Sequence, residues 1–323
     1  MGLARGAIAL MLEEAHARPF HGKIATLGRQ TIYTTAAEIG QQFVKFQVKP
    51  NGTIPPDMKD IQDTDVFGWM GCESVTSLDY SDFEGASRIV DLNKDSIPED
   101  LVGAFDIVLD SGTLEHVFHL PNAMKNTLSL LNIGGRIIFL SPSSNHLDHG
   151  FYMFSPTLFA DYFAANGFRI ETLYVVRYSG DLQEMWDAYS YQPGQWRDMH
   201  IGGLDDRPYA IWVVATRLEQ STIDVIPQQG YYADKNPAYA GSRLATGAIG
   251  KTEDVAIAPT TARPSVPSSV PHITAQSLIR KFARQVPGAR RIWRLIRNPL
   301  HTKGITNVAP THQIFRKKIV GKF

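Results

Sequence analysis

The chain has 323 residues, 43% of them apolar and 20% charged, which suits a globular protein with one large domain or two small ones. Its 32 Lys and Arg residues balance its 32 Asp and Glu residues, and no stretch approaches the roughly 20 consecutive apolar residues of a membrane span. The single cysteine, Cys72, excludes an intramolecular disulfide and a cysteine-based zinc cluster, and a reducing, cytoplasmic location is expected.

Apolar runs alternate with helical patterns along the first two thirds of the chain. The expected helices cover the N-terminal stretch up to residue 18 and residues 35–46, 66–70 and 120–131, and a further one begins at Ser155, a natural N-cap. The expected strands cover residues 23–27, 74–78, 88–90, 105–109, 136–140, 168–176 and 210–216. Strands separated by helices predict an α/β fold with a doubly wound, mostly parallel sheet of seven strands. No helical pattern separates the last two strands, so the final one is expected to enter antiparallel.

Several of the predicted strands end in a residue that suits a binding site. Gly28 follows the first strand, and Asp79, Asp91 and Asp110 end the next three. In a doubly wound sheet, ligands bind beyond the carboxyl ends of the strands. Carboxylates accept hydrogen bonds from ribose hydroxyls and exocyclic amines. Three acids at successive strand ends therefore predict a nucleoside site, although any one of them is also an ordinary turn former.

Two linked segments resemble a known family. Residues 105–117 (FDIVLDSGTLEHV) are similar to the fourth strand and following loop of small-molecule, class I S-adenosylmethionine-dependent methyltransferases. Residues 130–138 (LLNIGGRII) resemble the glycine turn into strand five of the same family. The resemblance covers roughly residues 20–216. It implies a Rossmann-like methyltransferase domain over residues 1–222, with S-adenosylmethionine as the cofactor.

The resemblance also implies roles for individual residues. Asp79 matches the acid that binds the ribose hydroxyls, and Asp91 matches the acid near the adenine amine. Ser111 and Gly112 match the loop that lies near the sulfonium.

The loop after the first strand departs from the family's pattern. The family usually shows an acid followed by three glycines at alternate positions. Here Thr26 takes the place of the acid, Gly28 is kept, and Gln30 and Ile32 replace the other glycines. A side chain there limits how closely the backbone approaches a ligand. Either the cofactor lies slightly displaced, with Arg29 or Gln30 contacting its carboxylate, or cofactor binding has been lost.

Histidines follow strands four and five, whose loops should open on the same end of the sheet. A hydroxyl acceptor benefits from a general base, for which histidine is the usual residue. We predict His149 as the base on the acceptor side and His116 as a second candidate, against the alternative that each only holds its turn. His146, Asp148 and His149 also offer ligands for a divalent ion. No fourth ligand stands at a recognisable spacing, so no metal site is predicted.

Two features bear on the acceptor. The tetrapeptide NPPY, which marks many amino-group methyltransferases, is absent, and this favours oxygen as the methylated atom. An aromatic-rich insert, residues 186–196, either walls an acceptor site or belongs to the core. A small or carbohydrate-like acceptor, such as a surface-glycan sugar, is the expectation.

The composition changes beyond residue 222. Residues 223–273 hold six prolines among small polar residues, which predicts a disordered linker. Residues 275–323 hold twelve Lys or Arg and no Asp or Glu, and 274–323 is predicted to be a basic amphipathic tail. An anionic membrane surface, or an assembly at the inner face of the membrane, is the expected partner. Nucleic acid is the rival partner, and a solvated tail without a partner is the third possibility.

Three functions were weighed from these observations. The first is an O-methyltransferase dependent on S-adenosylmethionine. The second is a catalytically inactive methyltransferase-like module that binds a glycan, a nucleotide or a protein, which the altered glycine loop favours. The third, a nicotinamide-dependent oxidoreductase, needs a Gly-x-Gly-x-x-Gly turn that is missing after Gly28.

Overall fold

The computed structural model of the protein describes residues 2–199, 202–233 and 319–322. The strands are β1 (Gly2–Leu3), β2 (Lys23–Leu27), β3 (Thr31–Ile32), β4 (Ser74–Asp79), β5 (Arg88–Ile89), β6 (Phe105–Ser111), β7 (Leu131–Pro142), β8 (Arg169–Arg177), β9 (Asp187–Ser190), β10 (Tyr209–Thr216) and β11 (Ile319–Lys322). The helices are α1 (Arg5–Ala17), α2 (Ala36–Lys45), α3 (Asp63–Met70), α4 (Leu120–Ser129), α5 (Pro156–Ala165) and α6 (Gly230–Ala233), with short 3-10 turns η1 (Glu99–Leu101), η2 (Leu114–His116) and η3 (Arg197–Met199).

The main sheet confirms the predicted doubly wound arrangement. Its order is β11-β9-β8-β10-β7-β6-β2-β4-β5, while β1 and β3 form a separate parallel pair. Strands β2, β4, β5, β6 and β7 are parallel, and β10 lies antiparallel between β7 and β8, as the missing helix before it indicated. The chain winds from β2 through β4 to β5 in one direction and through β6 to β7 in the other. The switch point therefore lies between β2 and β6, where doubly wound sheets bind ligands.

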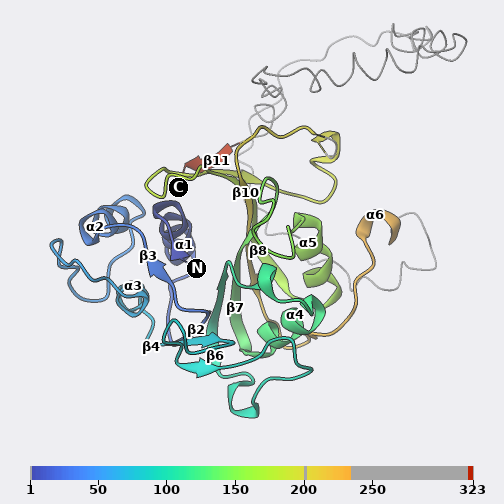
Figure 1. Ribbon diagram of the computed structural model, residues 1–323, viewed down its shortest axis with the longest axis horizontal. Coiled ribbons are helices and arrows are strands. Elements are labelled where there is room, and N and C mark those ends of the chain that lie inside the picture. The colour runs from blue at the N-terminus through green and yellow to red at the C-terminus, as the bar shows by residue number, and fades with distance from the viewer. Residues whose placement is uncertain (1, 200–201, 234–318, 323) are drawn as a thin grey trace, which may run out of the picture. The chain divides into compact units, whose positions relative to one another are not determined.

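Helices cover both faces of this sheet. Helices α1, α2 and α3 lie on one face, and α4 and α5 lie on the other (Figure 1). Each layer buries its own apolar cluster against the strands. Capping hydrogen bonds stabilise the first turns of two of these helices. Thr35 and Glu38 form a capping box at α2, and the Ser155 hydroxyl accepts a hydrogen bond from the Thr157 backbone N–H at α5.

Four strands were not predicted: the short pair β1 and β3, and two strands of the main sheet. Strand β9 lies within the aromatic insert and pairs antiparallel with β8, and β11 in turn pairs antiparallel with β9. Trp186 and Tyr189 of this insert are buried in the core, so this half of the insert has the structural role. Strand β11 lies within the predicted tail, of which the structure describes only residues 319–322.

The first residues beyond 222 are held against α5, which the linker prediction did not anticipate. The Asn166 side chain donates to the Val225 carbonyl and accepts from the Val225 N–H, both at 3.0 Å. The Tyr162 hydroxyl donates to the Ile223 carbonyl at 2.5 Å. The rest of the predicted linker and of the tail, residues 234–318, lies outside the described residues. Within the described ranges, no helix combines the length and apolar character needed to cross a bilayer.

A buried ionic network joins α1 to the first half of β7. The Arg136 guanidinium, 6% exposed, donates to Glu14 Oε1 at 2.6 Å and to the Arg18 and Pro19 carbonyls at 2.7 and 2.9 Å. Arg18 pairs with the other Glu14 oxygen. The Glu14 carboxylate is therefore compensated on both oxygens, which makes its burial tolerable.

The neighbouring Glu13 gives the fold a pH-dependent weakness. Burial, and then the charge of Glu14, raise the pKa of Glu13 to about 7, against a smaller opposing effect of Arg18. A buried carboxyl group with a raised pKa does not lower the free energy of unfolding while it is protonated. Its ionisation lowers that free energy as the pH rises from about 4 towards 8. We expect Glu13→Gln to leave the free energy of unfolding unchanged at pH 4 and to raise it by about 1–2 kcal/mol at pH 8, measured by urea unfolding.

Glu38 provides a control of opposite sign. Hydrogen bonds from Thr35 and Thr34 lower the pKa of Glu38, so its ionised form stabilises the fold. Glu38→Gln should therefore destabilise at pH 8 and have little effect near pH 3. A benefit of Glu13→Gln that is equal at pH 4 and pH 8 would contradict the account.

Candidate functional site

Hydrogen bonds hold neighbouring strand ends together at the switch point. Gly28 follows β2 with φ +73°, a left-handed conformation that favours glycine, and its N–H donates to the Leu78 carbonyl of β4 at 2.6 Å. On the other side, the Thr113 hydroxyl donates to the Leu27 carbonyl at 2.8 Å. The carboxyl ends of β4, β2 and β6 are thus held together as one edge.

The two polar residues after Gly28 are engaged within the protein. The Arg29 guanidinium pairs with buried Asp63 at 3.0 Å. Gln30 is 3% exposed, and its amide nitrogen donates to the carbonyls of Leu27 and Gly28 at 3.1 and 3.3 Å. Gln30 therefore fills the inside of the loop where the family has glycine. A contact of Arg29 or Gln30 with a cofactor carboxylate remains a prediction, and these bonds would have to be exchanged to form it.

Asp79 and Asp91 both lie half-buried at this edge. Strands β4 and β5 are neighbours, and Asp79 is in register with Ile89, two residues before Asp91. The backbone N–H and side-chain amide of Asn93 donate to one oxygen of Asp91 at 3.0 Å, and these bonds lower the pKa of Asp91. Asp91 is therefore held ionised with its other oxygen available to a ligand.

The third predicted acid is wrongly placed for a ligand. Asp110 is fully buried, and one of its oxygens accepts from the backbone N–H groups of Thr113 and Leu114 at 2.9 and 3.4 Å. It therefore shapes the loop after β6 and does not face a nucleoside, which corrects the expectation of three accessible acids. Ser111 is 5% exposed, and Gly112 turns the chain with φ +94°.

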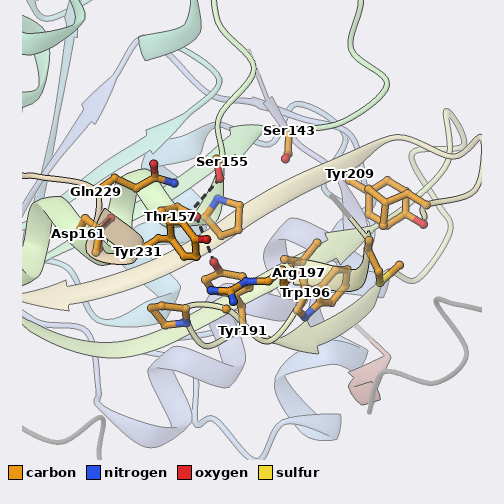
Figure 2. A pocket seen from close by; sticks show the side chains of 17 residues that line it. Ser143, Ser155, Thr157, Asp161, Tyr191, Trp196, Arg197, Tyr209, Gln229 and Tyr231 are labelled. Atoms are coloured by element: carbon orange, nitrogen blue, oxygen red, sulfur yellow. Dashed lines mark hydrogen bonds between the residues drawn. The ribbon is translucent and has the colours of Figure 1, made fainter. Parts of the chain in front are cut away.

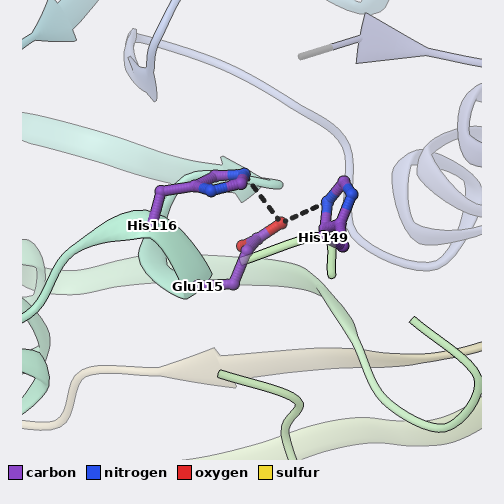
Figure 3. Close-up of side chains that lie close together, drawn as sticks. All are labelled: Glu115, His116 and His149. Atoms are coloured by element: carbon purple, nitrogen blue, oxygen red, sulfur yellow. Dashed lines mark ion pairs between the residues drawn. The ribbon is translucent and has the colours of Figure 1, made fainter. Parts of the chain in front are cut away.

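His116 and His149 come together around a carboxylate that the sequence reasoning did not single out. Glu115 and His116 lie on η2 after β6, and His149 lies on the loop after β7 (Figure 3). Glu115 Oε1 lies 3.4 Å from His149 Nε2 and 3.9 Å from His116 Nε2. The two imidazole rings are 5.2 Å apart. We call these three residues the Glu-His-His cluster.

Backbone contacts fix the two loops of the cluster against each other. The Glu115 carbonyl accepts from the N–H groups of Phe151 and Tyr152 at 2.8 and 3.2 Å. A Cβ at Gly150 would lie 2.9 Å from that carbonyl oxygen and 3.2 Å from His116 Nδ1. The absence of a side chain at Gly150 therefore allows the close approach that brings His149 to Glu115.

The electrostatics of the cluster centre on the buried carboxylate. The Glu115 side chain is 1% exposed, whereas those of His116 and His149 are nearly half exposed. Neither Glu115 oxygen accepts a hydrogen bond from any described residue. Burial raises the pKa of Glu115, and burial together with the charge of His149 lowers the pKa of His116. A buried acceptor without donors is costly and calls for a specific explanation.

Further groups extend the cluster along the sheet edge. The Tyr178 hydroxyl, just beyond β8, lies 2.8 Å from His146 Nε2, and the rings of His146 and His149 are 5.5 Å apart. Asp148, considered with these histidines as a metal ligand, is not among the described residues whose ligand atoms converge. Glu115 takes that place, and the only signal for it was its position next to His116 in the motif.

A cavity of about 360 Å³ opens beside the loop that carries His149 (Figure 2). Ser143, at the beginning of that loop, and Ser155, at the start of α5, line it on one side. Tyr191 and Trp196 of the aromatic insert line it with Tyr231. Tyr191 is nevertheless buried and Trp196 is only half-buried against the core, so this half of the insert both packs on the core and lines the cavity.

Comparison with known proteins finds likeness in fold. No family model matches the chain, and no curated protein sequence matches it. Among solved structures, the S-adenosylmethionine-dependent methyltransferase from Mesorhizobium loti is 16% identical, with a TM-score of 0.32 over 66% of this chain and 99% of that one. A geranyl diphosphate methyltransferase in complex with SAM is 13% identical, with a TM-score of 0.35 over 66% of this chain and 85% of that one.

A third similar structure is the 1,6-didemethyltoxoflavin-N1-methyltransferase of Burkholderia thailandensis, with bound S-adenosylhomocysteine. It is 13% identical, with a TM-score of 0.32 over 67% of this chain and 78% of that one. The function proposed below rests on the residues at the sheet edge.

Proposed function

We propose that this protein is an S-adenosylmethionine-dependent methyltransferase that acts on a small acceptor at the carboxyl edge of β2, β4, β5 and β6. The observation that carries the proposal is the pair of half-buried carboxylates, Asp79 and Asp91, on neighbouring strand ends beside the switch point. Their chemistry fits an adenosyl group, because carboxylates accept hydrogen bonds from a ribose diol and from an exocyclic amine.

Different residues of this edge would bind different parts of the cofactor. Asp79 would hold the ribose hydroxyls and Asp91 the adenine amine, while Ser111 and Gly112 would line the loop near the sulfonium. When bound, S-adenosylmethionine supplies the methyl group from its sulfonium. The protein's contribution to such an in-line displacement is largely to hold the two reactants in position.

The acceptor side is assigned to the Glu-His-His cluster. His149 is half exposed on the loop after β7, and its imidazole can take a proton from an acceptor hydroxyl. The cavity lined by Tyr191 and Trp196 supports an acceptor with flat apolar faces and hydroxyl groups, which stack on aromatic rings and bind serine hydroxyls. We therefore propose O-methylation of a small or carbohydrate-like acceptor.

Calorimetry with S-adenosylhomocysteine tests the proposal. We expect micromolar binding to the wild-type protein and a Kd about 10–100-fold higher for Asp79→Asn, because the variant loses a charge-assisted hydrogen bond. Asp82→Asn, an exposed neighbour on the same loop, is the matched control and should bind as the wild type does. No heat of binding up to millimolar ligand would contradict the proposal and support the inactive binding module.

A further inference from the structure

The Glu-His-His cluster has the composition of a metal site. A carboxylate and two imidazoles are ligands that divalent transition metals share. The three ligand atoms lie within 4.8 Å of one another. Ligand atoms around a tetrahedral zinc ion, each about 2.0–2.2 Å from it, are separated by about 3.3–3.5 Å. The 3.4 Å between Glu115 Oε1 and His149 Nε2 already matches this spacing, and the 3.9 Å between Glu115 Oε1 and His116 Nε2 lies close to it.

The second observation is the state of Glu115 itself. Its carboxylate is 99% withdrawn from solvent and faces both histidines, yet neither oxygen accepts a hydrogen bond within the described ranges. A bound cation would supply the missing partner. The two histidines are nearly half exposed, so an ion has a path from solvent to the buried oxygen.

We propose that Glu115, His116 and His149 bind one divalent transition-metal ion, with zinc as the first probe. Three protein ligands leave at least one coordination position open, as in catalytic zinc sites. The cluster lies on the loops after β6 and β7, at the end of the sheet proposed for methyl transfer, so the link to catalysis rests on the proposed function. There the ion would bind and polarise the acceptor hydroxyl. A bound ion would occupy the imidazole lone pair of His149, so His149 would then hold the ion and would not accept the proton. The ion would make the acceptor hydroxyl more acidic, and its proton would pass to solvent water.

Direct metal binding tests the proposal without an activity assay. The full chain, purified without a histidine tag, is titrated with Zn²⁺ by calorimetry and with Co²⁺ by visible absorption. We expect one ion per chain, and an affinity lowered by more than about 100-fold in Glu115→Gln, since the loss of a direct ligand should exceed that of an outer-shell partner. His149→Gln should behave in the same way. His21→Gln, an exposed histidine before β2, should bind as the wild type does.

Further variants distinguish the loss of a metal ligand from a failure to fold. Glu115→Gln keeps the shape of a buried side chain, and thermal unfolding verifies that it folds. His149→Gln changes a half-exposed residue. Gly150→Ala retains all three ligands but forces a contact with the Glu115 carbonyl, so it should also weaken metal binding.

The outcomes distinguish failure of the metal site from failure of the proposed methyltransferase function. Absence of stoichiometric binding, or equal affinity in wild type and Glu115→Gln, overturns the metal site. Binding of S-adenosylhomocysteine to the same sample would then leave the methyltransferase proposal intact. Metal binding without binding of S-adenosylhomocysteine would support the metal site and contradict the methyltransferase proposal.

Discussion

Replacing His149 by alanine is expected to lower the rate of methyl transfer by about 10²–10⁴-fold, while the affinity for S-adenosylhomocysteine changes by less than about threefold. The large effect follows whether His149 accepts the proton or holds an ion, because both roles act on the acceptor oxygen. Its side chain is 49% exposed, so little packing is lost with it. Conversion of S-adenosylmethionine to S-adenosylhomocysteine, with the best acceptor from a panel of hydroxylated small molecules and sugars, measures the rate.

His21→Gln serves as the matched control for this measurement. His21 is exposed at the opposite, amino end of β2, away from the proposed site. It should retain the wild-type rate. A His149→Ala variant that turns over within threefold of the wild type would remove His149 from the chemistry.

Replacing Arg136 by methionine is expected to lower the free energy of unfolding by about 3–5 kcal/mol, because it leaves the buried Glu14 carboxylate without its main partner. Two backbone carbonyls of the turn after α1 would lose their donors as well. Urea unfolding followed by circular dichroism measures the change. This site lies in the first half of β7, away from the carboxyl end of the strand, so the effect concerns the fold and not the proposed chemistry.

Two controls accompany this variant. Arg169 is half exposed in its pair with Glu171, which keeps Arg18 and Thr216 as partners, so Arg169→Met should cost less than about 1 kcal/mol. The double variant Glu14→Leu with Arg136→Met removes both buried charges and should recover most of the lost stability. A cost for Arg136→Met as small as that for Arg169→Met would contradict the assigned role of the network.

Much of the fold could be predicted because its signals are local. Apolar runs followed by Gly28, Asp79 and Asp91 marked the parallel strands and their carboxyl ends, and the capping residue Ser155 marked a helix start. Strands β9 and β11 were missed for a physical reason. Each has four residues, and their pairing joins segments far apart in the chain, so it depends on tertiary contacts that no short window contains.

The site could be predicted by position but not by orientation. His116 and His149 were expected over the same edge, and the structure brings them together. Whether a side chain turns inward depends on its packing. Glu115 is buried between the histidines, Asp110 is buried below its loop, and Gln30 folds back onto the Leu27 carbonyl. No pattern in the sequence distinguishes the buried Glu115 and Asp110 from the half-buried Asp79.

We expect one adenosyl ligand to lie across the ends of β4, β5 and β6 although Gln30 fills the first loop. A crystal structure of the protein with S-adenosylhomocysteine tests it directly. We predict ribose hydroxyls at about 2.6–3.2 Å from the Asp79 carboxylate, the adenine amine at Asp91, and the thioether sulfur beside Gly112. A saturated crystal with no ligand at this edge, or with the ligand bound away from Asp79 and Asp91, would contradict it.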